Sequence, residues 1–431
     1  MSNAKEFKRL PGFRDFPPAE LAARNRLFEA WRRVACRYGF QEYDAPPLES
    51  LDLYREKSGE EIVGQLYAFT DQGGREVALR PEMTPSLARV LGERSRSLPK
   101  PIRWFSVPQL FRYERQQRGR LREHFQWNVD IVGEEGHAAD VEVLAVAIDG
   151  VRELGLGSED VVARVSDRRL LSALLEEAGV EAQWMEPVFT VVDKVEREPA
   201  DRIRARLVER VGLEESVADA VLGLFEETGL EAIEARFGDR PAVAERLEIL
   251  RHYFADLEAM GFGPYVSFDL TIVRGLAYYT GIVFELFDRQ GELRAVCGGG
   301  RYDRLLELVG GDPLPAVGFG MGDVVLSELL ERRGLQPEYA RHVDLYIVPI
   351  RPEQRGLALR IARAQRERGR SAVYSLREQS VRKQFAAAEA AGAGSVVILG
   401  PDEVERGRVV VRAMATGQEE ERPLEELLDG E

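Results

Sequence analysis

Residues 111–130 read FRYERQQRGRLREHFQWNVD and carry the most informative pattern in the chain. From Phe125 onward this segment alternates strictly between apolar and polar residues. Because successive side chains of a β-strand point to opposite faces, this period of two predicts a strand with one apolar and one polar face. A second predicted strand, at residues 103–115, precedes it across a basic turn, as in an antiparallel pair. The apolar set is Phe125, Trp127, Val129 and Ile131, and the polar set is Gln126, Asn128 and Asp130.

The polar face of this strand pair has two interpretations. It is either the solvent-exposed side of an antiparallel sheet or the floor of a site for a small zwitterionic or phosphorylated ligand. Arg112 and Glu114 share one face of the preceding strand. Arginine suits a phosphate or carboxylate, and a carboxylate suits an amine or an imidazole N–H. These residues alone leave both interpretations open.

Two further segments place polar groups at the ends of predicted strands. Pro81 ends one strand and leaves Glu82 and Thr84 at its exit, where Thr84 also suits the N-cap of a helix. Residues 273–281 carry an Arg-Gly pair and two tyrosines between apolar strands, a pattern that also fits simple packing.

A third segment, residues 297–303, carries three consecutive glycines before Arg301. Glycines let a ligand approach the backbone closely, although a tight structural turn has the same composition. The segment is neither a Walker loop nor a dinucleotide fingerprint, because the required lysine and spacing are absent.

The succession of patterns along the chain predicts an α+β fold. Strand-rich segments at 1–156 and 261–333 indicate a mainly antiparallel sheet flanked by helices, and helical residues 157–260 form an insertion between them. A linker at 334–341 leads to residues 342–431, where strands alternate with helices, as is typical of a small α/β domain.

Composition limits the class of protein. No apolar run approaches the ~20 residues of a membrane span, and the first residues lack the apolar core of a signal peptide. With 2 cysteines and 4 histidines in 431 residues, neither a disulfide framework nor a zinc cluster is expected. The formal net charge of −15 argues against indiscriminate nucleic-acid binding but allows a local basic face. We therefore expect a cytoplasmic protein with no membrane partner and no protein-bound metal.

Taken in order, these motifs resemble the histidyl-tRNA synthetase family, a class II aminoacyl-tRNA synthetase family. Residues 111–130 are similar to class II motif 2, and Arg274 to Gly281 resembles the histidine-specific signature. The resemblance runs nearly end to end, including the helical insertion and a C-terminal domain similar to the family's anticodon-binding domain. The other matching segments are residues 10–15, 79–84, 297–303 and 316–319.

The resemblance implies a histidine–tRNA ligase. Histidine and ATP, with Mg²⁺, would form histidyl-adenylate and pyrophosphate, and the histidyl group would then pass to the 3′ end of tRNA-His. The likeness also implies a homodimer.

The resemblance further implies roles for individual residues. Arg112 and Arg274 are the expected catalytic residues, and the basic turn between the two strands is expected to contact the tRNA acceptor stem. The expected histidine contacts are Glu82, Thr84, Gln126, Asp130, Tyr278 and Tyr279; the expected ATP contacts are Arg112, Glu114, Arg274 and Arg301; and the expected acceptor contacts are Arg115, Gln117, Arg118 and Arg120.

Two positions depart from the family pattern. Ala277 stands where the signature usually has Asp, and Val325 stands where the family commonly has an arginine that contacts the ATP γ-phosphate. Arg301 or Arg304 is a candidate to compensate, and Asp323 suits the N-cap of the next helix.

The missing arginine supports one alternative, a synthetase-like paralogue that binds histidine as a regulatory subunit. Retention of Arg112, Arg274, Glu82 and the C-terminal domain opposes that alternative. A synthetase for another amino acid is disfavoured by the histidine-specific signature.

Overall fold

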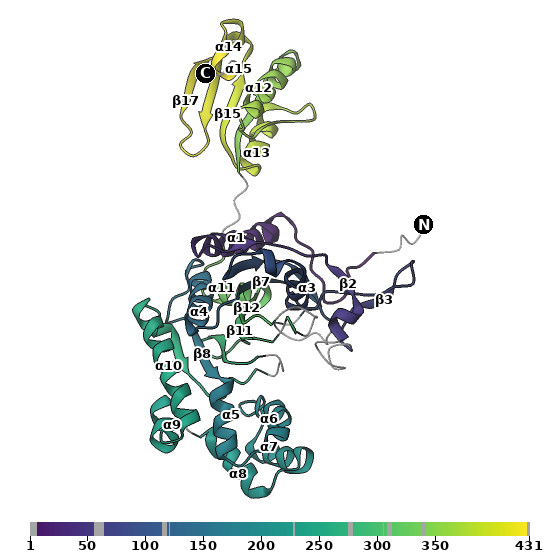
Figure 1. The fold of residues 1–431 in the computed structure, drawn as a ribbon. Coiled ribbons are helices and arrows are strands. Elements are labelled where there is room, and N and C mark those ends of the chain that lie inside the picture. The colour runs from purple at the N-terminus through teal and green to yellow at the C-terminus, as the bar shows by residue number, and fades with distance from the viewer. Residues whose placement is uncertain are drawn as a thin grey trace. The chain divides into compact units, whose positions relative to one another are not determined.

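The computed structural model describes residues 7–55, 64–113, 119, 121–226, 229–274, 279–304, 306–307, 313–337 and 342–428. The chain separates into two compact units, Met1–Gln336 and Pro337–Glu431 (Figure 1). Their boundary lies inside the segment 334–341 that the sequence assigns to a linker. Each unit has hydrophobic clusters of its own.

A mixed sheet of nine strands forms the centre of the first unit. Every neighbouring pair from β5 to β8 is antiparallel, whereas β1 and β9 add parallel strands at the two edges. The predicted α+β class with a mainly antiparallel sheet is therefore confirmed. In spatial order the strands are β1 (Gln41–Glu42), β5 (Ile102–Ser106), β7 (Glu123–Val132), β12 (Ala316–Gly322), β11 (Cys297–Arg301), β10 (Ile282–Asp288), β8 (Val161–Asp167) and β9 (Val266–Phe268), with β6 (Gln109–Phe111) paired to β7.

Helices cover the apolar face of this sheet, where the odd-numbered residues of β7 lie. The helices are α1 (Pro18–Arg37), α4 (His137–Arg152) and α11 (Asp323–Arg332). Trp127 stacks on Trp31 of α1 with ring centroids 5.9 Å apart, and its edge meets Phe319 of β12 at 5.1 Å. Trp31 and Trp127 are fully buried. The alternation read from residues 123–132 thus sets which face of the sheet becomes the core.

The opposite face carries a smaller apolar cluster and a short second sheet. Helix α3 (Thr84–Arg94) contributes Leu87 and Leu91 to a cluster with Tyr279 and Tyr302. The second sheet, in the order β2 (Leu48–Ser50), β4 (Glu76–Leu79) and β3 (Ala68–Thr70), confirms the predicted hairpin at 66–80.

The helical insertion begins later than the sequence indicated. Residues 161–167 form β8, which pairs with β10 inside the central sheet, so the predicted boundary at residue 157 is wrong. The apolar residues 188–192 lie in one of its helices. The helices are α5 (Arg168–Glu177), α6 (Met185–Val192), α7 (Ala200–Arg206), α8 (Glu215–Leu224), α9 (Leu230–Phe237) and α10 (Pro241–Ala259), with a π-helical turn at Leu207–Val211.

The second unit is a five-stranded sheet with helices on both faces. Its three parallel strands confirm the predicted α/β domain, and two antiparallel strands that the sequence reading did not include extend it. The strand order is β14 (Ala372–Tyr374), β13 (Val343–Pro349), β15 (Ala393–Leu399), β16 (Arg408–Ala413) and β17 (Glu419–Pro423). The helices are α12 (Arg355–Glu367), α13 (Val381–Ala390), α14 (Pro401–Glu405) and α15 (Glu425–Leu428).

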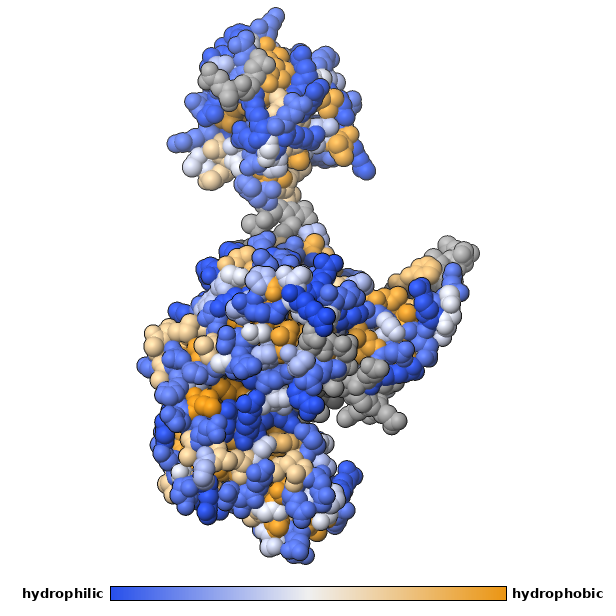
Figure 2. All heavy atoms as spheres, viewed as in Figure 1, coloured by the Kyte–Doolittle hydropathy of each residue, from blue (hydrophilic) through white to orange (hydrophobic). Residues whose placement is uncertain are grey.

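Hydrophilic residues cover most of the face drawn in Figure 2, with apolar residues scattered among them. Among the described residues, no helix has both the length and the apolar character that crossing a membrane requires.

The packing of Trp127 against α4 yields a stability prediction. A β-carbon at Gly150 would lie 2.4 Å from Cζ3 of the buried Trp127, so we expect Gly150→Ala to destabilise the first unit by about 1–3 kcal/mol through overpacking. Gly223→Ala in α8 is the matched control, because its β-carbon meets nothing within 4 Å. The control should stabilise the helix by about 0.5–1 kcal/mol. Urea unfolding followed by tryptophan fluorescence measures the free energy of unfolding of both variants. Equal changes in the two variants would contradict the close packing of Gly150 against Trp127.

Candidate active site

Five glycines line one face of the central sheet, on the neighbouring strands β11 and β12. We call Gly298, Gly300, Gly318, Gly320 and Gly322 the glycine floor. Gly298 lies opposite Gly320, and Gly300 lies opposite Gly318. Because directly paired residues point to the same face of a sheet, all five positions expose bare backbone on the side away from Trp127. The polar residues of β7 continue this face on the other side of β12, since Gly318, Gly320 and Gly322 pair with Asp130, Asn128 and Gln126.

Polar side chains from neighbouring segments lie directly over the glycine floor. A β-carbon at Gly298 would fall 1.4 Å from Nη1 of Arg274, and one at Gly320 would fall 2.6 Å from Nε2 of Gln126. A β-carbon at Gly318 would fall 2.2 Å from Oδ1 of Asp130. Any side chain at these three positions would displace a polar group, so glycine is what lets those groups reach the face of the sheet.

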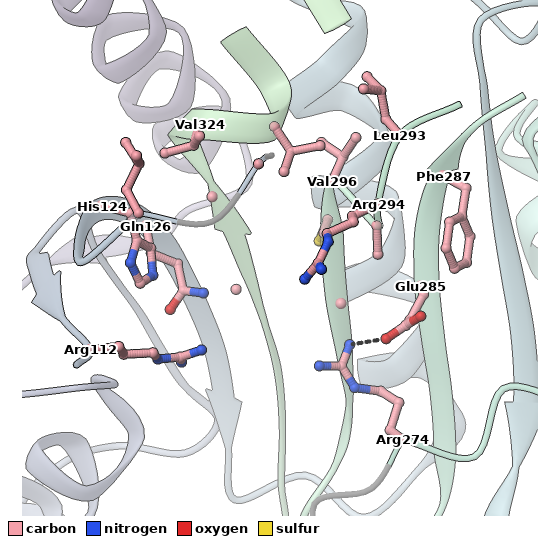
Figure 3. A pocket seen from close by; sticks show the side chains of 18 of the residues that line it. Arg112, His124, Gln126, Arg274, Glu285, Phe287, Leu293, Arg294, Val296 and Val324 are labelled. Atoms are coloured by element: carbon pink, nitrogen blue, oxygen red, sulfur yellow. Dashed lines mark ion pairs between the residues drawn. The ribbon is translucent and has the colours of Figure 1, made fainter. Parts of the chain in front are cut away.

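A cavity of about 650 Å³ opens above the floor. Arg112, Arg274 and Arg294 point into it from different segments of the chain, and Gln126 lies beside Arg112 (Figure 3). The positive charges of these three arginines suit a ligand with several negative charges, such as a polyphosphate. The remaining lining residues are Gly119, Leu121, His124, Arg197, Glu285, Phe287, Leu293, Ala295, Val296, Cys297, Gly298, Gly320, Gly322, Val324 and Val325.

Arg274 has a constrained backbone. Its φ of +51° makes it the one non-glycine residue in the left-handed region among the described residues. The buried Arg168 donates hydrogen bonds to the carbonyl oxygens of Arg274 (3.1 Å) and Val273 (3.5 Å), and its guanidinium lies over the ring of Phe189 in α6. Left-handed backbone outside glycine costs free energy, and the surrounding contacts must maintain it. The insertion therefore helps to hold the turn that aims Arg274.

The Arg274 side chain is oriented by contacts of its own. It pairs with Glu285 at 3.6 Å (Figure 3), donates to the carbonyl of Phe284 and lies 5.3 Å from the ring centroid of Tyr279. A cation fixed in this way stabilises negative charge without first having to reorganise.

Arg112 links two of the predicted motifs. Its Nε donates to the carbonyl of Pro81 at 3.0 Å, which fixes the loop that carries Glu82 and Thr84. Thr84 is the first residue of α3, whose N-cap Met83 makes no side-chain cap bond, so the expected N-cap role of Thr84 is wrong. Glu82 and Thr84 are half-buried and do not line the cavity.

Asp130 and Tyr279 lie together at the Gly300–Gly318 end of the floor. The hydroxyl of Tyr302 donates to the carboxylate of Asp130, which is 6% exposed, and the rings of Tyr279 and Tyr302 meet edge to face. A buried, oriented carboxylate beside aromatic rings is a suitable environment for an imidazole N–H.

Arg301 lies elsewhere, which corrects the prediction that it binds ATP. It pairs with Val317 across β11 and β12, and therefore points to the face opposite the glycine floor. There it forms a buried ion pair with Asp140 of α4 and donates to the carbonyls of Glu134 and Gly136. Burial raises the pKa of Asp140, and the charge of Arg301 opposes that shift. Arg301 is thus a structural residue that fastens α4 to the sheet.

A second buried network joins three distant motifs. Arg14 forms ion pairs with Glu123 of β7 at 2.6 Å and with Asp323 of α11 at 2.8 Å. Asp323 also accepts a hydrogen bond from the backbone N–H of Phe125 at 2.9 Å. Asp323 is the first residue of α11 and Gly322 is its N-cap, so the expected N-cap role of Asp323 is wrong. The carboxylate of Asp323 instead joins the helix to β7.

Several predicted residues lie outside the described part of the chain. Other residues of the site were missed by sequence reasoning, because their neighbours come from distant segments. His124 alone carried a usable signal, since it shares the even-numbered face of β7 with Gln126. The missed residues are His124, Arg168, Arg197, Glu285 and Arg294. The predicted residues outside the described part of the chain are Glu114, Arg115, Gln117, Arg118, Arg120, Ala277 and Tyr278.

Comparisons with known proteins give matches over almost the whole chain. Residues 12–323 match the family described as histidyl-tRNA synthetase, and residues 344–430 match the anticodon binding domain. The chain is 43% identical to a histidine–tRNA ligase of Opitutus terrae, over 98% of this chain and 97% of that protein. It is 40% identical to the chloroplastic/mitochondrial histidine–tRNA ligase of Arabidopsis thaliana, over 96% of this chain and 85% of that protein.

The fold is shared with a solved structure. The crystal structure of histidyl-tRNA synthetase from Nostoc superposes with a TM-score of 0.80 at 22% identity, covering 98% of each chain. At that identity the similarity concerns the fold alone.

The glycine floor yields a binding prediction. Gly298→Ala should push the Arg274 guanidinium off the sheet and weaken ATP binding about 10- to 100-fold, the range for a lost hydrogen bond to a charged group. Gly92→Ala in α3, outside the cavity and with nothing within 4 Å of the new β-carbon, is the matched control and should leave the affinity for ATP unchanged. Isothermal titration calorimetry measures both. Equal affinities of the two variants for ATP would show that the floor does not position Arg274.

Proposed function

The chain belongs to the histidyl-tRNA synthetase family, and from that premise we propose how its residues divide the reaction between them. Its function is the ATP-dependent ligation of histidine to tRNA. The observation that supports the assignment of roles is the placement of Arg112 and Arg274 at one cavity over the glycine floor. Nothing in the comparisons favours the regulatory alternative.

Histidine occupies the Gly300–Gly318 end of the floor in this proposal. Asp130 accepts a hydrogen bond from the imidazole N–H, with Tyr302 fixing the carboxylate, and Tyr279 packs beside the ring. Gln126 holds the amino acid from β7, and Glu82 and Thr84 receive its α-amine. Tyr278, which is adjacent in sequence to Tyr279, belongs to the same proposal.

ATP lies along the floor, with its α-phosphate between Arg112 and Arg274. An oxygen of the histidine carboxylate attacks the α-phosphorus, so a new P–O bond forms and the bond to pyrophosphate breaks. The two arginines neutralise the charge that develops on the α-phosphate oxygens, and Arg274 is already oriented by Glu285 and Phe284. Positioning and electrostatics suffice, because the attacking carboxylate is part of the substrate.

Mg²⁺ accompanies ATP in this proposal. Glu285 is the carboxylate that lines the cavity among the described residues, and it suits a hard cation whose other ligands are phosphate oxygens. When bound, the ion neutralises phosphate charge. Glu114 is proposed to meet the adenine.

Transfer to tRNA-His uses both units of the chain. The acceptor stem is proposed to meet Arg115, Gln117, Arg118 and Arg120, which are close in sequence to Gly119, a residue that lines the cavity. The second unit has the anticodon-binding fold, and its residues Arg377, Arg382 and Lys383 are exposed. The proposal further includes a homodimer and a cytoplasmic location, both of which rest on the family likeness.

Charging specificity tests the assigned function. The full chain, incubated with ATP, Mg²⁺ and total tRNA, should attach labelled histidine to tRNA and none of the other standard amino acids. Attachment of a different amino acid, or of none by folded protein, would refute the assignment.

Removal of the second unit separates the activation of histidine from its transfer to tRNA. A chain ending at Gln336 keeps every described cavity residue and all clusters of the first unit. We expect histidine-dependent pyrophosphate exchange to persist within about tenfold, while tRNA charging falls by a much larger factor. Unchanged charging kinetics would contradict the role of the second unit.

A further inference from the structure

One arginine that is expected to contact ATP is absent from the cavity. Val325, in the first turn of α11, lines the cavity with an apolar side chain where an arginine for the γ-phosphate is expected. Neither of the two compensating arginines suggested by the sequence is at the cavity. Arg301 is committed to Asp140 on the opposite face, and Arg304 is exposed, pairs with Glu307 at 3.3 Å and does not line the cavity.

Arg294 lines the same cavity as Val325. It belongs to the connection between β10 and β11, and its side chain extends into the cavity, with Arg112 and Arg274 on the other sides (Figure 3). A β-carbon at Gly119 would lie 3.4 Å from Cγ2 of Val325 and 3.9 Å from Cδ of Arg294. The two side chains therefore border the same space next to Gly119, and both line the cavity.

We propose that Arg294 binds the γ-phosphate of ATP in place of the arginine that Val325 replaces. This proposal rests on the proposed function, in which Arg112 and Arg274 hold the α-phosphate. A guanidinium is always protonated and presents paired N–H donors to phosphate oxygens, whichever direction along the chain it comes from. The same charge is thus supplied from the β10–β11 connection and not from α11.

The proposal predicts a loss of affinity that depends on the length of the phosphate chain. Arg294→Ala should weaken ATP binding about 10- to 100-fold and leave AMP binding nearly unchanged, because AMP lacks the γ-phosphate. Arg304→Ala, which removes an exposed arginine outside the cavity, is the matched control and should bind ATP normally. Calorimetric titration with ATP, ADP and AMP in the absence of histidine measures the selectivity independently of turnover.

A second variant places an arginine at position 325, where the family commonly has one. Val325→Arg, introduced into the Arg294→Ala chain, should restore ATP affinity and lower the KM for ATP in pyrophosphate exchange. ATP affinity unchanged in Arg294→Ala, or an equal loss for ATP and AMP, would overturn the proposal. A loss of affinity for ATP but not for AMP in Arg304→Ala would overturn the proposal as well. The wild-type charging assay is unaffected by any of these results, so failure of this proposal and failure of the assigned function are distinguishable.

Discussion

The arrangement of the active site depends on one constraint, the alternation of side chains along the antiparallel strands β7, β12 and β11. One face of these strands carries Trp127, Phe319 and their neighbours, which bury against α1 and α4. The other carries the glycine floor. The period of a strand couples the two faces, so the residues that build the core also fix the positions at which the backbone is bare. A one-residue shift in register would bury polar groups and move aromatic rings into the cavity.

Arginine has two distinct uses around this sheet. Arg14, Arg168 and Arg301 are buried or half-buried and join segments that lie far apart in the sequence. Removing one partner of such a buried pair typically costs about 3–5 kcal/mol, because the other charge remains without compensation. Arg112, Arg274 and Arg294 instead face the cavity. The first group holds the motifs in place. The second group lines the cavity that a charged ligand would enter.

Much of the fold follows from local patterns, and the site follows from them in part. The alternation beginning at Phe125 predicted that Gln126 and Asp130 share one face of a strand, as they do in β7. Arg301 was misassigned because the three preceding glycines carry no apolar or polar signal, so the sequence could not show which face followed them. Arg168 and Arg294 were missed because tertiary packing alone brings Arg168 to the carbonyl of Arg274 and places Arg294 at the same cavity as Val325.

We propose that histidine and ATP react on the glycine floor. A crystal structure of the chain with a non-hydrolysable histidyl-adenylate analogue would show whether the analogue occupies this surface. We expect the analogue over Gly298 and Gly320, its phosphate mimic between Arg112 and Arg274, and its imidazole at Asp130. An analogue bound on the other face of the sheet, or with its phosphate mimic beyond the reach of both arginines, would refute this proposal.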